Sequence, residues 1–154
     1  MNTRRKRIIL GITGASGAIL GIRTLEIMRK SGLETHLIIS SAAMQTIEEE
    51  TNWSLEQVKA LADEVYENEN IAGRIASGSF VTEGMLINPC SIKTLSAVAT
   101  SYADNLINRA ADVCLKEGRP LLLAVRETPF HAGHLRLMQD VVQAGAIVFP
   151  VIPS

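Results

Sequence analysis

The sequence lacks a strong net charge, a cysteine pattern and a long apolar run. Its 154 residues carry a formal net charge of −1, which gives no general attraction to nucleic acid or to an anionic membrane. No segment reaches the roughly 18 uninterrupted apolar residues that a membrane span needs. Two cysteines without a C-x-x-C spacing are typical of a reducing compartment. We therefore expect a cytoplasmic protein with no nucleic-acid partner and no membrane partner.

Metal ligands and reactive side chains are also few. His131 and His134 are spaced as H-x-x-H, but zinc takes three or four ligands and no further cluster is in view, so we expect no metal. His36 lies in an apolar run, which favours a hydrogen-bonded structural role over a catalytic one. Cys90 has no histidine near it in the sequence, which favours a buried or lining thiol over a nucleophile. Cys114 fits a core position.

Short β-branched runs alternate with amphipathic, helix-like segments along the chain. The expected strands are residues 8–12, 35–40, 85–87, 120–125 and 146–151, and the expected helices include 18–30, 42–50, 55–62, 104–116 and 130–144. Five alternations predict a single α/β domain over residues 1–154. Its fold is expected to be a parallel, doubly wound sheet with helices on both faces. Residues 63–70 are interpreted as a polar connection, and 70–80 as either a mobile loop or a cover over a ligand.

A glycine-rich turn, Thr13 to Gly17, separates the first expected strand from the first expected helix. Such a turn leaves backbone N–H groups and the positive end of a helix dipole free to hold a phosphate. Its glycines match neither G-x-G-x-x-G nor a nucleotide-triphosphate loop. The alternative is a tight turn for helix packing, with Ser16 as the N-cap.

Hydroxyl and charged side chains follow the later strands as well. Ser40 and Ser91 each stand between a strand and a helix, and Arg126 and Glu127 follow the fourth strand. Carboxyl ends of parallel strands line the ligand crevice of such folds. An arginine there grips a phosphate with two hydrogen bonds and a glutamate handles protons. The alternative is a surface arginine beside a helix-start acid.

Six stretches, in order, resemble the UbiX-type flavin prenyltransferases. They are G-I-T-G-A-S-G-A-I at 11–19, I-I-S-S-A-A at 38–43, A-S-G-S-F at 76–80, N-P-C-S-I-K-T-L at 88–95, N-R-A-A-D-V-C-L-K-E at 108–117 and R-E-T-P at 126–129. The resemblance implies that the α/β fold is a single Rossmann-like (flavodoxin-like) FMN-binding domain. It also implies an enzyme that joins the dimethylallyl group of dimethylallyl phosphate to N5 and C6 of reduced FMN. The product would serve a UbiD-type decarboxylase. It also implies a homo-dodecamer with active sites where subunits meet, and chemistry that needs no metal.

Site residues follow from the same resemblance. The flavin would be held by Gly14, Ala15, Ser16, Ser40, Ser91, Ile92, Lys93, Thr94 and Arg126. The prenyl phosphate would be held by Arg109, Lys116 and Arg126. The catalytic residues would be Ser16, Glu50, Lys116 and Glu127. Without the resemblance, the helix face of Arg109, Asp112 and Lys116 is typical of a solvated row of ion pairs.

The end of the sequence departs from the family pattern. Members normally continue past the last strand with a P-x-F-Y segment and a further helix, which supply a tyrosine and an arginine to the prenyl-phosphate site. Here the sequence stops at Pro153-Ser154, so we expect FMN binding first and a truncated or inactive enzyme as an alternative. A related flavin-dependent cysteine decarboxylase is a further alternative. Its characteristic histidine and Asn-rich contexts are not found around His131 or His134.

Overall fold

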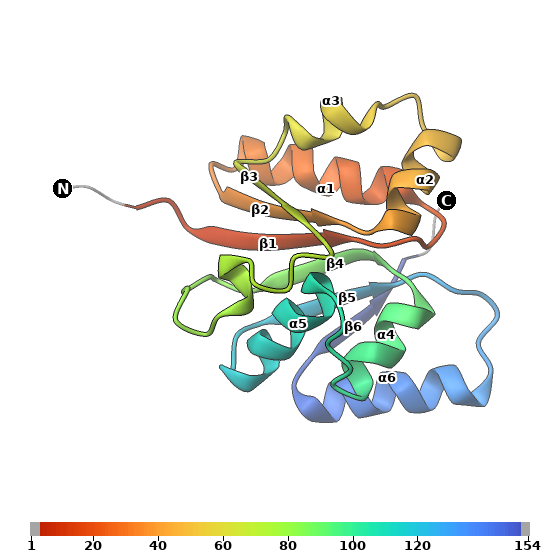
Figure 1. The fold of residues 1–154 in the computed structure, drawn as a ribbon. Coiled ribbons are helices and arrows are strands. Elements are labelled where there is room, and N and C mark those ends of the chain that lie inside the picture. Colours follow the sequence, from red (N-terminus) through yellow and green to blue (C-terminus); the bar gives the residue numbers. More distant parts are fainter. Residues whose placement is uncertain (1–3, 152–154) are drawn as a thin grey trace.

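The computed structural model describes residues 4–151, which form one six-stranded sheet whose strands all run parallel. The strand order is β3-β2-β1-β4-β5-β6 (Figure 1). The strands are β1 (Arg7–Ile12), β2 (Glu34–Ile39), β3 (Glu64–Glu67), β4 (Met85–Cys90), β5 (Leu121–Val125) and β6 (Ile147–Pro150). The chain moves outward from β1 to β3, then crosses to β4 on the other side of β1. Such a reversal of strand order leaves a crevice at the carboxyl ends of β1 and β4.

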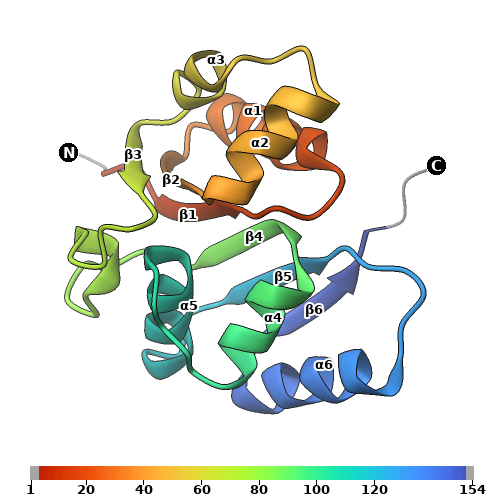
Figure 2. The same ribbon diagram turned by 45° about the vertical axis from the view of Figure 1, so that its right-hand side comes forward.

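Helices cover both faces of this sheet (Figures 1 and 2). On one face lie α1 (Ala18–Lys30), α2 (Ser41–Glu50) and α3 (Leu55–Lys59), and on the other lie α4 (Ile92–Ala99), α5 (Leu106–Lys116) and α6 (Ala132–Ala144). A short 3-10 helix, η1 (Arg74–Ala76), packs beside α5. The predicted α/β fold is confirmed. None of the helices within residues 4–151 is long and apolar enough to cross a membrane.

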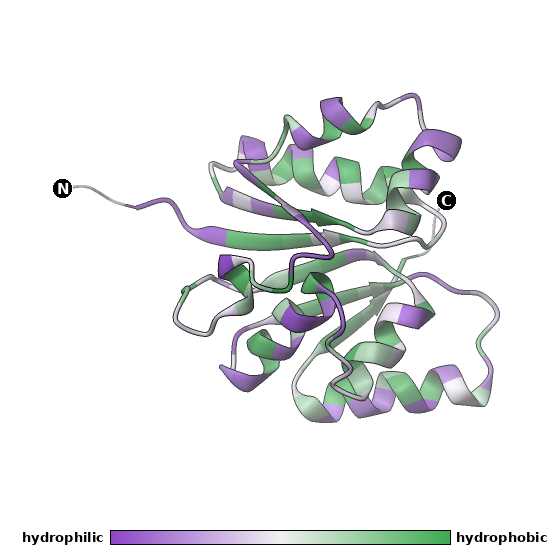
Figure 3. Cartoon of the chain, in the orientation of Figure 1, coloured by the Kyte–Doolittle hydropathy of each residue, from purple (hydrophilic) through white to green (hydrophobic). Residues whose placement is uncertain are grey.

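The core has two parts because successive strand residues point to opposite faces. Ile9 and Ile38 pack with α4, α5 and α6, whereas their neighbours along the strands, Leu10 and Leu37, pack with α1 and α2. The central strands are apolar on both sides (Figure 3), as expected for a sheet covered by helices on both faces.

The prediction of five strands was wrong. Residues 63–70, interpreted as a polar connection, contain β3, which pairs with β2 at the edge of the sheet. Glu64, Val65 and Glu67 are exposed there, so β3 lacks the apolar run by which central strands are recognised. Other boundaries also moved: β4 continues to Cys90, and α5 and α6 each begin two residues later than predicted.

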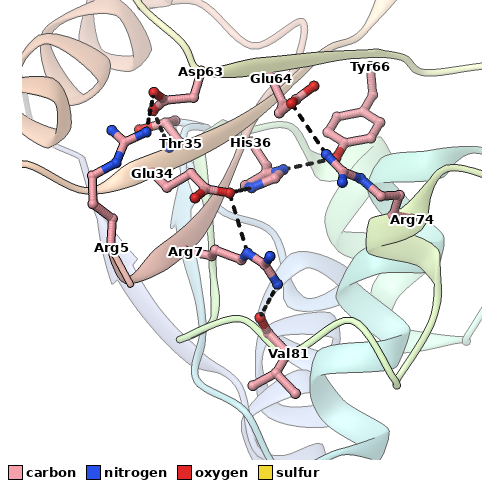
Figure 4. Close-up of polar contacts among 10 residues, drawn as sticks. All are labelled: Arg5, Arg7, Glu34, Thr35, His36, Asp63, Glu64, Tyr66, Arg74 and Val81. Atoms are coloured by element: carbon pink, nitrogen blue, oxygen red, sulfur yellow. Dashed lines mark hydrogen bonds and ion pairs between the residues drawn. The ribbon is translucent and has the colours of Figure 1, made fainter. Parts of the chain in front are cut away.

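A polar cluster at the amino ends of β1, β2 and β3 holds residues 70–83 against the sheet (Figure 4). His36 is fully buried, and its ring nitrogens contact the Tyr66 hydroxyl at 2.9 Å and a Glu34 carboxylate oxygen at 2.8 Å. The guanidinium of Arg7 lies 3.3 Å from the same carboxylate and 4.1 Å above the ring of Phe80. The structural role expected for His36 is thus confirmed. Phe80 ties its segment to the edge opposite the carboxyl ends, which argues against a ligand cover there.

This cluster changes the ionisation of Glu34. Its hydrogen bond with His36, helped by the charge of Arg7, holds the pKa of Glu34 below its usual range. The carboxylate therefore stabilises the fold above the pKa that Glu34 has in the unfolded chain. That stabilisation is lost as the pH falls through the lower pKa of the folded state.

We predict that Glu34→Gln lowers the free energy of unfolding by about 1–2 kcal/mol at pH 7, because buried His36 and Arg7 lose their anionic partner. The difference from the wild type should shrink as the pH falls towards 3. Urea unfolding at pH 7 and at pH 3 measures this difference in the free energy of unfolding. Glu64→Gln is the matched control, since Glu64 pairs with Arg74 at the surface and both side chains are about half exposed. Equal losses in the two variants would contradict the prediction.

Candidate functional site

Two turns at the carboxyl edge of the sheet are joined by one buried hydroxyl. The Thr13 hydroxyl, at the end of β1, donates to the Pro89 carbonyl at 2.7 Å and accepts from the Ser91 N–H at 2.9 Å. Thr13 is 2% exposed. Next to it, Gly14 lies so close to Ala42 of α2 that a side chain at residue 14 would collide with it. The starts of α1, α2 and α4 are thereby held around one point.

Serine caps leave free N–H groups at two of these helices. The Ser40 hydroxyl accepts from the Ala43 N–H at 3.1 Å, and the Ser91 hydroxyl accepts from the Thr94 N–H at 3.2 Å. The N–H groups of residues 41, 42, 92 and 93 have no acceptor within residues 4–151. Because helix dipoles make these ends positive, both are suited to an anion.

The amides at the start of α1 are already occupied. Glu50, at the end of α2, accepts from the N–H groups of Gly17 at 2.9 Å and Ala18 at 3.3 Å. Gly17 is the N-cap, with φ of 97°, and no side chain caps the helix from that position. The interpretation of Ser16 as an N-cap was therefore wrong, because a carboxylate from α2 does that work.

The start of α5 is capped by Asn68, the residue that directly follows β3. The backbone carbonyl of Asn68 accepts from the Leu106 N–H at 2.8 Å, and its side-chain oxygen accepts from the Ile107 N–H at 3.0 Å. Asn105 caps the N–H of Asn108 at 2.9 Å. The sequence reasoning missed these asparagines as site residues. A polar residue after an edge strand was the only signal for Asn68, and that strand itself was not recognised.

Two adjoining cavities open at this edge. The first, about 640 Å³, runs from Thr13 and Ser40 past Thr94 to the asparagine wall of Asn68, Asn105 and Asn108. The second, about 440 Å³, is lined by Gly14, Ala15, Ser16, Ser91, Ile92, Lys93, Arg126, Glu127 and Thr128. Gly14, Ser91 and Lys93 line both. The nine residues predicted to hold a flavin, and Glu127, thus lie together.

Three predicted residues are not on these cavity walls. Glu50 reaches the site only through its bonds to the start of α1. Arg109 and Lys116 lie on α5 and line neither cavity. Lys116 is two-thirds exposed and pairs with Glu117 at 3.8 Å, whereas the buried Nε atom of Arg109 has no hydrogen-bond partner within residues 4–151. The ion-pair row with Asp112 is not formed among the described residues.

Neither cysteine lines the two cavities. Cys90 ends β4 but is fully buried, and burial raises the pKa of its thiol to about 12. Burial likewise raises the pKa of Cys114 to about 11. Both thiols therefore stay protonated near neutral pH, whereas a cysteine nucleophile reacts as the thiolate. The expectations of a buried thiol at Cys90 and a core thiol at Cys114 are confirmed.

Comparisons with known proteins agree with this geometry. Residues 1–148 match the Flavoprotein family. The flavin prenyltransferase UbiX of Escherichia coli K12 is 56% identical over 150 residues, which cover 97% of this chain and 79% of that relative. The crystal structure of AnUbiX (PadA1) with FMN and dimethylallyl pyrophosphate has a TM-score of 0.96 at 48% identity, covering 98% of this chain and 80% of that chain. A dodecameric FMN-dependent UbiX-like decarboxylase from Escherichia coli O157:H7 has a TM-score of 0.93 at 46% identity, covering 96% and 80%.

The match over residues 1–148 shows that the chain is a member of the Flavoprotein family, and its parallel sheet is consistent with that class. Within that class, the chain belongs to the UbiX family of flavin prenyltransferases. This relationship favours a transferase over the two alternatives from the sequence, an FMN carrier and a cysteine decarboxylase.

We predict that Thr13→Val weakens both the fold and the site. Valine has the same shape but removes the hydroxyl. The buried Ser91 N–H then loses its acceptor, and the Pro89 carbonyl keeps only the longer bond from the backbone N–H of residue 13 at 3.3 Å, which should cost about 2 kcal/mol of unfolding free energy. Thr46→Val is the control, because the Thr46 hydroxyl only bonds carbonyls of its own helix. Urea unfolding and FMN titration measure the effects. A Thr13→Val protein that binds FMN like the wild type would contradict the prediction.

Proposed function

We propose that the protein transfers the dimethylallyl group of dimethylallyl phosphate to reduced FMN. The observation that carries this proposal is the convergence of free helix-start amides, Arg126 and Glu127 on two adjoining cavities where the strand order reverses. Each cavity falls within the size range of small-molecule sites. The named relatives support the same reaction.

The free amides suggest where the flavin phosphate binds. Four helix starts border the first cavity or its walls, and those of α1 and α5 are capped by Glu50 and Asn68. The starts of α2 and α4, beside Ser40 and Ser91, keep free N–H groups. We therefore place the phosphate of FMN at the starts of α2 and α4. The flavin ring then extends to the second cavity.

The second cavity then receives the prenyl phosphate. Arg126 is half-buried there, and its Nη1 atom lies 3.4 Å from the Val151 carbonyl, which leaves further N–H donors for an anion. Breaking the allylic C–O bond places negative charge on the departing phosphate. The guanidinium of Arg126 stabilises that charge as it develops, with the Ser16 hydroxyl on the same wall.

Glu127 is assigned the proton chemistry. The reaction breaks the allylic C–O bond, releases phosphate and forms bonds from the dimethylallyl group to N5 and C6 of reduced FMN. The hydrogens on N5 and C6 leave as protons, and one proton is added to the middle carbon of the allyl group, so that its double bond is used to form the bond to C6. Glu127 is exposed on the wall of the second cavity, so its carboxylate is available to accept the proton from C6. Reduced FMN supplies the electron-rich atoms for both bonds. We propose no metal in either step.

Arg109 and Lys116 enter the proposal through a second copy of the chain. Lys116 ends α5, ten residues beyond its first residue, so it lies about 15 Å along the helix from the asparagine wall at the helix start. It can take part in prenyl-phosphate binding only in the site of another subunit. A homo-dodecamer, as in the related UbiX-like decarboxylase, provides such neighbours. Glu50 would act by holding the turn at Ser16.

The setting of this reaction completes the proposal. We propose that residues 1–154 are one FMN-binding domain and that the prenylated flavin passes to a UbiD-type decarboxylase. We also propose a cytoplasmic location, which the two free thiols support because a reducing compartment preserves them.

We predict that Glu127→Gln retains FMN but slows prenylation at least tenfold, because glutamine cannot accept the proton. Purified protein is incubated anaerobically with reduced FMN and dimethylallyl phosphate, and the extracted flavin is weighed by mass spectrometry. Glu56→Gln is the control, since Glu56 is an exposed glutamate outside both cavities. An unchanged flavin mass with the wild-type protein would reject the proposed function. Loss of FMN from Glu127→Gln would instead give Glu127 a structural role.

We predict that two inactive variants restore each other when mixed. Glu127→Gln and Lys116→Ala subunits, dissociated and reassembled together, should form some sites with both residues intact, roughly a quarter under random assembly. The prenylation activity of the mixed assembly measures how many sites are restored. Mixing Glu127→Gln with Ser16→Ala is the control, because both residues line the same cavity of one chain. Equal activity in the two mixtures would show that Lys116 does not act across subunits.

A further inference from the structure

Two histidines cap each other at the start of α6. The Nδ1 atom of His131 accepts from the His134 N–H at 3.2 Å, and the Nδ1 atom of His134 accepts from the His131 N–H at 3.3 Å. This is a capping box, in which serine or threonine and glutamate usually hold these two places. The imidazole rings stack with their centroids 3.5 Å apart.

The box exists only while both rings are neutral. A ring nitrogen accepts a hydrogen bond when it carries no proton, so each ring must keep its proton on Nε2. Protonation of Nδ1 breaks the cap and adds positive charge at the positive end of the helix dipole. The groove beside the rings contains Lys93 of α4 with Arg136 and Asp140 of α6, two cations and one anion, so it offers little compensation.

Glycine between the histidines makes this geometry possible. A Cβ atom at Gly133 would lie 2.7 Å from Cε1 and 3.0 Å from Nδ1 of His131. The His131 ring would then have to leave its capping position. The spacing H-A-G-H therefore fits the reciprocal cap better than it fits a metal site, because both Nδ1 atoms are already engaged.

The capping box fixes one end of a segment that carries site residues. Residues 126–131 connect β5 to α6, and the Arg126 N–H is bonded to the Cys90 carbonyl at 3.0 Å at the β5 end. At the α6 end, the box holds His131. Arg126 and Glu127 line the second cavity, and Ile92 and Lys93 line both that cavity and the histidine groove.

We propose that His131 and His134 are positioning residues for the transfer reaction. In their neutral form they hold residues 126–131 so that Arg126 and Glu127 face the second cavity, and protonation releases this segment. The inference rests on the proposed function for its catalytic consequence, but the conformational change itself is independent of it.

The first test compares pH profiles. In the double variant His131→Ser with His134→Glu, a serine–glutamate capping box replaces the histidine box and does not titrate above pH 5.5. Between pH 7.5 and 5.5, kcat of the wild type should fall about tenfold more than kcat of the variant. Titration of the substrate phosphate affects both proteins equally. The test therefore uses the difference between the fall in kcat of the wild type and that of the double variant.

A second test does not depend on activity. Hydrogen exchange over residues 126–136, corrected for the intrinsic pH dependence, should show protection lost at pH 5.5 in the wild type and kept in the double variant. Gly133→Ala should lose protection at both pH values, although alanine is the better helix former. Equal protection and equal pH profiles in wild type and double variant would overturn the inference. The expected exchange pattern without any prenylation would support the histidine cap and overturn the proposed function.

Discussion

The site depends on a single buried hydroxyl shared by two turns. Thr13 donates to the carbonyl before Cys90 and accepts from the N–H of Ser91, so the end of β1 and the start of α4 cannot move independently. A buried group with both functions satisfied is rigid, because each broken bond leaves an unpaired polar atom. Both cavities are bordered by this junction, which explains why their shared residues, Gly14 and Ser91, stand on either side of it.

Protein acceptors occupy the amides at some helix starts and leave others free, and this decides where an anion can bind at the site. The fold brings several positive helix ends to one edge, but protein acceptors fill those of α1 and α5. Serine caps at α2 and α4 satisfy one N–H each and leave the first two free. An anion is therefore directed to one part of the edge rather than to all of it. Glu50 occupies amides at the start of α1 that would otherwise be free to bind an anion.

Sequence reasoning identified features that depend on neighbouring residues and missed contacts between residues far apart in the sequence. The α/β alternation, the serine caps at residues 40 and 91, and the pair at 126 and 127 each follow from neighbouring residues, and the structure brings them together. The edge strand β3 was missed because its exposed residues carry no apolar run. Glu50 as a cap for α1, and Asn68 as a cap for α5, join residues more than thirty positions apart, which no local pattern reveals.

The strand order has a consequence for how the molecule comes together. Strands β1, β2 and β3 form one continuous stretch of sequence, β4, β5 and β6 form another, and within the sheet the two stretches pair only through β1 and β4. Each stretch is a candidate cooperative folding unit, but neither contains the site by itself. Docking of the two units creates the site, so any ligand that binds there favours the docked state by mass action. The flavin would then act on the chain as a clamp between two halves before it acts as a reactant.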